Sequence, residues 1–155
     1  MAAQSAGIMM YHRRGGELRI LLVHPGGPFW RNKDEGAWSI PKGEYGPDED
    51  AEAAARRELS EELSHEAKGP LHPLGEVKQR GGKRVVAFAL EGDLDAASIR
   101  SNEFQLEWPP GSGRIQSYPE VDRAEWFSLP AAARKILAGQ LPFLDRLAEL
   151  CATES

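Results

Sequence analysis

The feature that most constrains this chain is an acidic, alanine-rich segment at residues 48–64. Alanines favour a helix, and Asp48 or Asp50 can cap its start, so the sequence predicts a helix over this segment. Apolar residues three and four positions apart form a stripe along it, made of Ala55, Leu59 and Leu63. The predicted helix can therefore dock on a core through this stripe and leave another face free for polar side chains.

Three glutamates share that other face, because residues three and four positions apart are neighbours on a helix: Glu58, Glu61 and Glu62. Like charges at this spacing destabilise a helix by roughly 0.2–0.5 kcal/mol. A divalent cation removes this repulsion, and hard oxygen ligands suit Mg²⁺ or Mn²⁺. Arg57 lies four residues before Glu61 and could orient it through an ion pair. The alternative is a solvated acidic face, which is what most glutamate-rich helices present to water.

The wider spacing favours the metal site, because Gly43 to His65 resembles the Nudix box. In that motif five residues separate a glycine from a glutamate, and seven more separate this glutamate from the run Arg-Glu-aliphatic. One further residue then precedes Glu-Glu. The chain matches at Gly43, Glu49, Arg57, Glu58, Leu59, Glu61 and Glu62. At average residue frequencies the six Gly, Arg and Glu matches arise by chance in about one in 10⁵ chains of this length.

The end of the box departs from the pattern. Ser64 stands where the motif has glycine, and His65 where it has an aliphatic residue. A glycine at such a place suits a left-handed helix cap. With Ser64 at this position, the sequence does not fix the residue at which the helix ends, and the helix could extend towards Gly69. The acidic face is not affected, so we expect metal binding to be retained.

The resemblance extends along most of the chain. Residues 38–44 look like the strand and loop that lead into the box in this superfamily, and residues 120–127 look like its late strand. The resemblance implies an α/β fold, a Nudix-like α/β/α sandwich with a mixed β-sheet, in a single domain over residues 1–155. It implies Mg²⁺-dependent hydrolysis of a diphosphate linkage in a nucleoside diphosphate-linked substrate. Dinucleoside polyphosphates and nucleoside triphosphates are favoured over nucleotide sugars, because the chain is short and shows no added sugar-recognition domain.

The same resemblance assigns roles to the box residues. One to three ions of Mg²⁺, with Mn²⁺ as a possible substitute, would be bound by the Gly43 carbonyl, Glu58, Glu61 and Glu62. A metal-bound water loses its proton more easily and attacks one phosphorus. Glu49 and Arg57 would support the geometry of the loops and the helix.

The general base is open between a box glutamate and a carboxylate outside the box. Within the box the candidate is Glu62. Outside it the candidates are Glu103, Glu107 and Glu120, and we select Glu120. Each of these three is more often an ordinary surface acid than a base. Lys42, next to the box, is a candidate phosphate contact, although a solvated loop lysine is an equal alternative.

Aromatic residues in predicted loops could stack on a nucleobase: Phe29, Trp30, Trp108 and Tyr118. Phe29 and Trp30 are the selected substrate-binding candidates, and the alternative for each is that it covers the core. Trp38 and Trp126 are expected in the core or in strands. The histidines lack convincing metal-ligand spacing, so none receives a catalytic role.

The remaining pattern interleaves strands with helices, which predicts a mixed sheet with helices packed on it. Residues 13–16 form a turn between two apolar runs, and the second run, residues 18–23, is expected to be buried on both faces. Residues 94–119 have no assigned element apart from a loop at residues 109–111. Predicted strands lie at 5–12, 17–24, 37–40, 72–79, 84–91 and 125–127, and predicted helices at 130–138 and 142–150.

Composition limits the partners. The formal net charge is −5, which disfavours a stable nucleic-acid complex through a basic face. Cys151 is the only cysteine, so no intramolecular disulfide can form. Residues 1–11 have no basic segment before their apolar residues, and no apolar run reaches spanning length. We therefore expect a cytoplasmic monomer or homodimer that binds a small nucleotide and no membrane.

A second hypothesis is a non-catalytic Nudix-like module that binds or senses a nucleotide. The altered end of the box, at Ser64 and His65, is the feature in its favour. Such a module would be expected to lose box carboxylates, whereas this chain keeps all of them. The sequence therefore favours the enzyme, a Nudix pyrophosphohydrolase acting on acid anhydrides.

Overall fold

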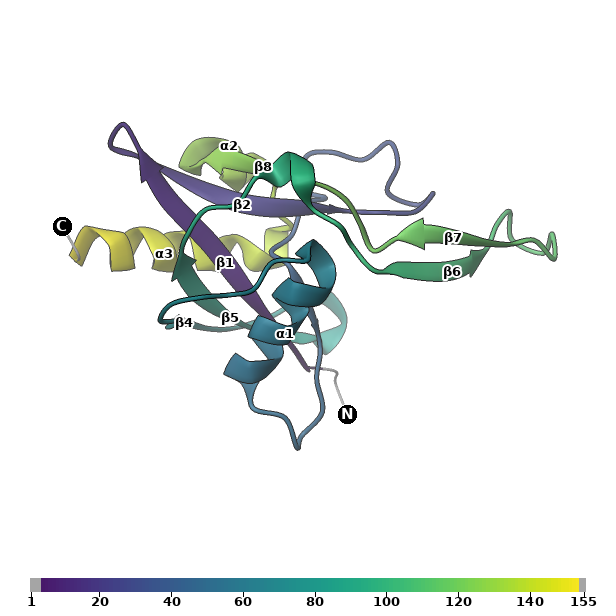
Figure 1. Cartoon of the computed structure of the whole chain (residues 1–155), viewed down its shortest axis with the longest axis horizontal. Helices are drawn as coiled ribbons and strands as arrows, with labels where there is room; N and C mark the ends of the chain where they lie inside the picture. The colour runs from purple at the N-terminus through teal and green to yellow at the C-terminus, as the bar shows by residue number, and fades with distance from the viewer. Residues whose placement is uncertain (1–3, 154–155) are drawn as a thin grey trace.

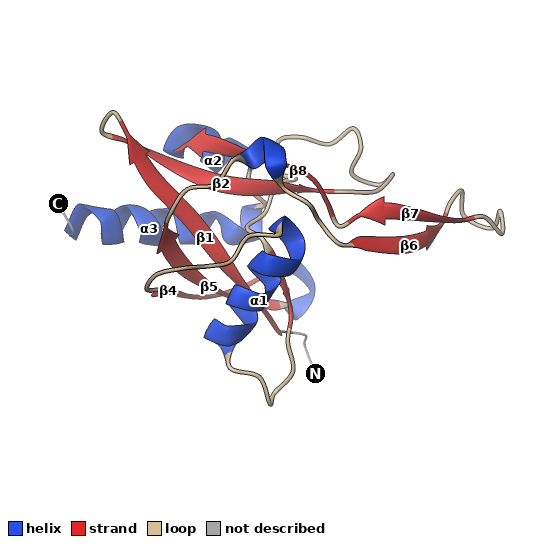
Figure 2. Cartoon of the chain, in the orientation of Figure 1, coloured by secondary structure: helices blue, strands red, loops and turns tan. Residues whose placement is uncertain are grey.

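A six-stranded mixed β-sheet forms the centre of the computed structural model, which describes residues 4–153 (Figures 1 and 2). The strand order is β4-β5-β1-β2-β8, and β3 also pairs with β1. Strands β1 and β5 are parallel, whereas the other pairs are antiparallel. The strands span Gln4–Arg14 (β1), Glu17–Pro25 (β2), Lys42–Glu44 (β3), His72–Lys78 (β4), Arg84–Glu91 (β5) and Val121–Ser128 (β8).

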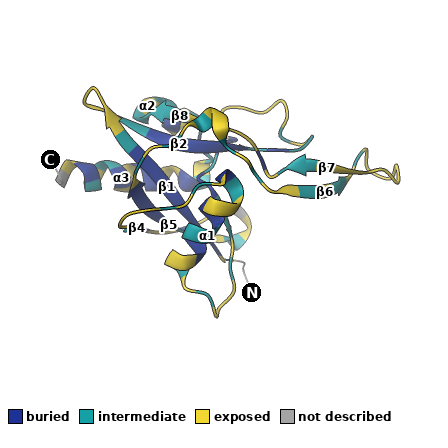
Figure 3. Cartoon of the chain, viewed as in Figure 1, coloured by how far each residue is buried: buried dark blue, intermediate teal, exposed yellow. Residues whose placement is uncertain are grey.

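Helices cover both faces of this sheet, which confirms the predicted α/β class and its layers. Helix α1 (Ala51–Leu63) crosses one face, and α2 (Leu129–Lys135) and α3 (Leu141–Thr153) lie on the other (Figure 1). In β2, Ile20 and Leu22 join the core beneath α2 and α3, while Leu21 and Val23 join the core beneath α1. The strand is thus buried on both faces, as its sequence predicts, and Figure 3 shows the buried residues concentrated in the central strands.

The predicted hairpin between β1 and β2 is confirmed. Its turn consists of Gly15 and Gly16, with φ of 61° and 81°, between the paired residues Arg14 and Glu17. A two-residue turn with positive φ at both positions follows the right-handed twist of the flanking strands, and glycine adopts it without steric cost.

Helix α1 is shorter than the segment predicted to contain it. Its N-cap is Asp50, whose carboxylate accepts a hydrogen bond from the Ala53 amide at 3.1 Å. The expected extension towards Gly69 is wrong, because Ser64 adopts the left-handed conformation (φ 53°, ψ 40°) and ends the helix. The Ser64 hydroxyl donates to the Arg100 carbonyl at 2.7 Å. This tertiary contact holds serine in a conformation that usually requires glycine.

This cap predicts a stability difference between two substitutions. Ser64→Gly and Ser64→Ala both remove the hydroxyl, but only alanine keeps the steric penalty of the left-handed conformation. We expect the glycine variant to be the more stable by about 1 kcal/mol in urea unfolding. Equal stability of the two variants would show that residue 64 leaves this conformation when the hydroxyl is lost.

Other boundaries differ from the sequence-based expectation for local reasons. Residues 37–40 form isolated bridges, Trp38 to Ile136 and Ser39 to Val23, and the true strand β3 begins after Pro41. Helix α2 ends at Lys135, because Ile136 is extended and the Leu137 amide bonds the Trp38 carbonyl at 2.8 Å. A short 3₁₀ turn at Ala138–Gln140 then leads into α3.

The segment without assigned elements contains a two-stranded sheet of its own. Strands β6 (Glu103–Glu107) and β7 (Ile115–Pro119) project from the body as an antiparallel pair (Figure 1). Further 3₁₀ turns lie at Arg80–Gly82 and Ala96–Ser98. Over residues 4–153, no helix combines the length and the apolar character needed to cross a bilayer.

Candidate active site

The box residues line a pocket of about 370 Å³ between β3, α1 and the segments that flank the projecting hairpin. The sequence-predicted residues that meet here are Lys42, Gly43, Glu58, Glu61, Glu62 and Glu120. Its other lining residues, Ser5, Glu44, Lys83 and Asn102, were not selected from the sequence. The pocket therefore joins residues from β1, β3, α1 and three separate loops.

The short strand β3 and helix α1 approach each other closely at Gly43. A Cβ atom at this position would lie 2.1 Å from the carboxyl carbon of Glu58, so only glycine leaves room for that carboxylate. The Lys42 amide, one residue earlier, donates to a Glu62 carboxylate oxygen at 3.1 Å. Leu59 and Leu63 anchor the opposite side of the helix in the core. The helix is therefore held with Glu58 and Glu62 against the β3 backbone.

Arg57 binds three carboxylates at once. It holds Glu49 through two hydrogen bonds, from Nε and Nη2, each of 2.9 Å. Its Nη1 donates to Glu58 at 2.8 Å and to Glu61 at 3.3 Å. The Arg57–Glu61 pair anticipated from the helical spacing is thus present, but Glu49 is the bidentate partner. This pairing lowers the pKa of Glu49 and ties the loop before α1 to the helix.

Burial makes the pocket costly for negative charge. Burial, together with the smaller effect of the charge of Glu58, raises the pKa of Glu62 to about 8 against the opposing effect of Lys42. Burial likewise raises the pKa of Glu58, whose side chain is only 10% exposed, although Arg57 partly offsets this. Burial also lowers the pKa of the Lys42 ammonium. Two neighbouring carboxyl groups, of buried Glu58 and half-buried Glu62, can therefore accept either protons or a cation.

This electrostatic state gives a pH-dependent prediction. Without metal, folded Glu62 keeps its proton up to about pH 8, whereas its unfolded-state value is near 4.5. As the pH rises between these values, the unfolded chain releases a proton that the folded protein retains, so the free energy of unfolding falls. The contribution is fully present below pH 4.5 and is lost through pH 8.

Chemical denaturation at a series of pH values, in EDTA, measures this contribution as the difference between wild type and Glu62→Gln. Added Mg²⁺ should stabilise the wild type increasingly over the same range, because a ligand carboxylate must be deprotonated. Parallel curves for the two proteins would show that the Glu62 carboxyl has no raised pKa.

The residues of this pocket fit a divalent ion in their chemistry. Their donors are hard oxygens, namely the carboxylates of Glu58, Glu61 and Glu62 and the Gly43 carbonyl, and Mg²⁺ prefers such ligands. In residues 4–153, no group of three His, Cys, Asp or Glu side chains has the arrangement of a formed metal cluster. Arg57 holds Glu58 and Glu61 instead. A bound cation would therefore compete with this guanidinium for the carboxylates.

Glu120 faces the same pocket from the segment between β7 and β8. Its amide bonds the Asn102 carbonyl at 2.8 Å, and its carbonyl accepts from Gly26 at 3.0 Å. The negative charge of Glu120 makes a small contribution to the raised pKa of Glu62, after burial and the charge of Glu58. The other two candidates outside the box, Glu103 and Glu107, are exposed on β6 and do not line this pocket.

A second, more apolar pocket of about 270 Å³ adjoins the first and shares Lys42, Glu62 and Glu120 with it. Trp30 lines this pocket together with Val23, Pro25, Ile40, Val121 and Leu137. Phe29 does not line either pocket. It is 60% exposed and packs edge-on against Trp108 with ring centroids 5.2 Å apart. Trp38 is 1% exposed in the core, as expected.

Three of the residues not selected from the sequence come from distant parts of the chain. Ser5 lies in an apolar strand, and its buried hydroxyl has no hydrogen-bond partner among the described residues. Lys83 follows the turn between β4 and β5, and Asn102 precedes β6, where its amide donates to the Glu61 carbonyl at 3.3 Å. The pairing of β1 with β3 and β5 brings Ser5 and Lys83 to the pocket, and backbone hydrogen bonds to Glu61 and Glu120 hold Asn102 there, so no local motif marks these residues.

Comparisons with known proteins agree with this geometry. A family model described as NUDIX domain matches residues 1–147. A solved C. elegans Ap4A hydrolase binary complex is similar at 23% identity and a TM-score of 0.65, over 96% of this chain and 98% of that chain. The NUDIX domain of Shewanella oneidensis NrtR, complexed with ADP ribose, is similar at 18% identity and a TM-score of 0.64, over 97% of this chain and 89% of that chain.

A mutT/nudix family protein from Listeria innocua is also similar, at 20% identity and a TM-score of 0.64, over 98% of this chain and 95% of that chain. No curated protein sequence matches the chain. At these identities the solved structures show a shared fold, while the family model covers nearly the whole sequence. The chain therefore belongs to the Nudix family, as its box indicates.

Proposed function

We propose that this protein catalyses Mg²⁺-dependent hydrolysis of a diphosphate linkage in a small nucleotide substrate, with Mn²⁺ as a possible substitute. One observation carries the proposal: buried and half-buried carboxylates line a pocket that opens directly onto an apolar one. A diphosphate and a nucleobase need these two environments side by side. Dinucleoside polyphosphates and nucleoside triphosphates are the favoured substrates, and the likeness to an Ap4A hydrolase supports the first class.

We assign Glu58, Glu61, Glu62 and the Gly43 carbonyl as the metal ligands. When bound, Mg²⁺ would activate the attacking water and stabilise negative charge on the diphosphate oxygens. Lys42 is assigned to a phosphate oxygen, because its side chain is in the same pocket and carries the opposite charge. Arg57 is a positioning residue, since it binds Glu49, Glu58 and Glu61 and orients the helix carboxylates.

We assign Glu120 as the acceptor of the proton that the attacking water releases. Its support is its place in both pockets, next to Glu62 but on a different segment of the chain. Glu62 itself is the alternative acceptor. We assign Trp30 to the nucleobase, because it lines the apolar pocket, where an aromatic ring can stack. Phe29 would contact only a part of the substrate that extends beyond that pocket.

A panel of substrates tests the function. The protein is incubated with dinucleoside polyphosphates, nucleoside triphosphates, ADP-ribose and nucleotide sugars, with Mg²⁺, with Mn²⁺ or with EDTA. We expect metal-dependent cleavage of a compound from the first two classes, with products identified by mass. Cleavage in ¹⁸O-labelled water then identifies the attacked phosphorus. Nucleotide binding without turnover of any compound would instead support the non-catalytic sensing module.

A further inference from the structure

A third pocket, of about 480 Å³, lies at the opposite end of β1 from the acidic pocket. Ser5, near the start of β1, lines the acidic pocket, whereas His12 and Arg14, near its end, line this one. At the rise of an extended strand, Ser5 and His12 are roughly 23 Å apart. The two pockets share no residue. We call this third pocket the arginine pocket, after its lining residues Arg14 and Arg19.

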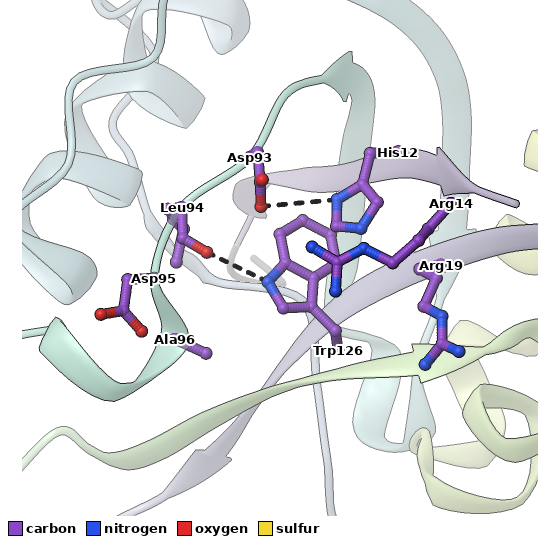
Figure 4. Close-up of a pocket in the computed structure, with 8 residues that line it drawn as sticks. All are labelled: His12, Arg14, Arg19, Asp93, Leu94, Asp95, Ala96 and Trp126. Atoms are coloured by element: carbon purple, nitrogen blue, oxygen red, sulfur yellow. Dashed lines mark hydrogen bonds and ion pairs between the residues drawn. The ribbon is translucent and has the colours of Figure 1, made fainter.

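Strand pairing places the polar residues of the arginine pocket on one face of the sheet. His12 pairs directly with Arg19, and Trp126 pairs with Leu21, two residues further along β2. Leu21 belongs to the core beneath α1, so this is the sheet face that α1 covers elsewhere. At this end the segment at residues 93–96 borders the face instead. Figure 4 shows His12, Arg14 and Trp126 grouped next to that segment, with Arg19 beside them and its guanidinium directed away from the Trp126 ring.

Two buried nitrogen atoms in this pocket lack hydrogen-bond partners in the described structure. They are Nε of Arg19 and Nδ1 of His12. Nδ1 lies 3.6 Å from Asp93, a separation of ion-pair type that is longer than a hydrogen bond. Buried donors are normally satisfied, so the Arg19 Nε–H group without a partner indicates a missing acceptor, whereas Nδ1 of His12 can be a donor or an acceptor depending on its tautomer. Figure 4 shows the Arg14 guanidinium directed into the same space.

The formal charges that line the arginine pocket balance, because Arg14 and Arg19 are accompanied by Asp93 and Asp95, so an anion would have to compete with these carboxylates for the arginines. Asp95 is engaged elsewhere, because its carboxylate accepts from the Ala97 amide at 3.0 Å and caps a 3₁₀ turn. The remaining acids each have one neighbour: Asp93 lies 3.6 Å from the His12 ring, and Glu17 lies 3.5 Å from Arg19.

Trp126 forms an apolar wall of the arginine pocket. Its ring packs against the His12 ring with centroids 4.0 Å apart, and its indole N–H donates to the Leu94 carbonyl at 3.1 Å. The indole donor is therefore satisfied, and the donors left for a ligand are those of the arginines. Guanidinium groups match the oxygens of phosphate in both charge and geometry.

From this arrangement we propose that the arginine pocket binds a small phosphate-bearing anion, either inorganic phosphate or a nucleoside monophosphate. The anion would accept hydrogen bonds from Arg14 and Arg19 and would supply the acceptor that Arg19 Nε lacks. The pocket volume lies within the range of small-molecule sites. This site is separate from the acidic pocket, so the proposal stands or fails independently of the proposed catalytic function.

The Trp126 indole gives a local probe of binding. The chain has four tryptophans, and Trp126→Phe identifies the Trp126 indole signal in a ¹H–¹⁵N spectrum. The full-length protein in EDTA is titrated with inorganic phosphate in one series and adenosine 5′-monophosphate in another. We expect a saturable shift of the Trp126 signal in at least one series. Tighter binding of the nucleotide would identify a nucleoside monophosphate as the ligand, and equal binding would identify the phosphate group alone.

Variants separate this site from non-specific charge effects. Arg14→Gln combined with Arg19→Gln should weaken binding by about tenfold or more, because hydrogen bonds to charged groups contribute on this scale. The matched control is Arg134→Gln, which removes an exposed arginine on α2 that pairs with Glu35. This variant should bind the anion as the wild type does. Asp93→Asn should bind more tightly, since it removes a competing carboxylate, and an unfolded variant could not give such a gain.

The outcomes that overturn the proposal are equally specific. A Trp126 shift that increases linearly with ligand, without saturation, would mean that no site exists. Unchanged binding in the double arginine variant would remove the assigned donors. A response confined to the Trp30 signal would place the anion in the pockets next to the box, and the arginine pocket would then have no phosphate ligand.

Discussion

Replacing Glu62 with glutamine is expected to lower kcat by about 10³-fold, within the range found for catalytic acid–base groups. Glutamine has the same shape and can still accept the Lys42 amide hydrogen bond, so the loop and the helix should stay in contact. The substitution removes a carboxylate from the pocket, and with it one proposed metal ligand. The measurement is kcat at saturating substrate and Mg²⁺, with the best substrate from the panel.

Glu52→Gln is the matched control, because Glu52 is an exposed acid on the same helix and lies outside the pocket. It should keep the kcat of the wild type. The Glu62 variant should also lose most of its stabilisation by Mg²⁺, while its metal-free form should be at least as stable as wild type above pH 8. That last effect follows because the variant has no buried charge to desolvate. An unchanged kcat in Glu62→Gln would remove Glu62 from the site.

The parts of this site that depend on short-range spacing could be predicted from the sequence. Glu58, Glu61 and Glu62 share a helical face because the periodicity of a helix requires it. The aliphatic stripe is equally local, and Leu59 and Leu63 are buried as it predicts. The two-residue turn at Gly15 and Gly16 is determined by backbone sterics. Each of these features is determined by residues that are close in sequence, within two turns of a helix or within one hairpin.

Features that depend on distant contacts could not be predicted in the same way. Arg57 takes Glu49 as its bidentate partner because the loop before α1 folds back, which helical spacing alone does not reveal. Ser64 ends the helix with the help of Arg100, 36 residues later. The hairpin of β6 and β7 is largely exposed, so burial contributes little to its sequence pattern. Glu120 reaches the pocket only because its backbone bonds Asn102 and Gly26.

A methyl group at Gly43 is expected to remove most of the activity while leaving the protein folded. In Gly43→Ala the new Cβ would overlap the Glu58 carboxylate, at 2.1 Å from its carboxyl carbon. Its clash is with the end of a side chain that can rotate away, so we expect a loss of only about 1–3 kcal/mol in the free energy of unfolding. The displaced carboxylate, however, can no longer occupy its place against the Gly43 backbone. A displacement of this kind lowers kcat/KM by about 10²-fold.

Gly46→Ala is the control for any general effect of replacing a loop glycine, because a Cβ there would meet no atom within 4 Å. It should retain full activity. The steric explanation can also be isolated by a double-mutant cycle with Glu58→Gln. If Gly43→Ala acts by displacing the Glu58 carboxylate, then adding it to Glu58→Gln should cause little further loss of kcat/KM. Fully additive losses would mean that Gly43 acts on the reaction by a route that does not involve Glu58.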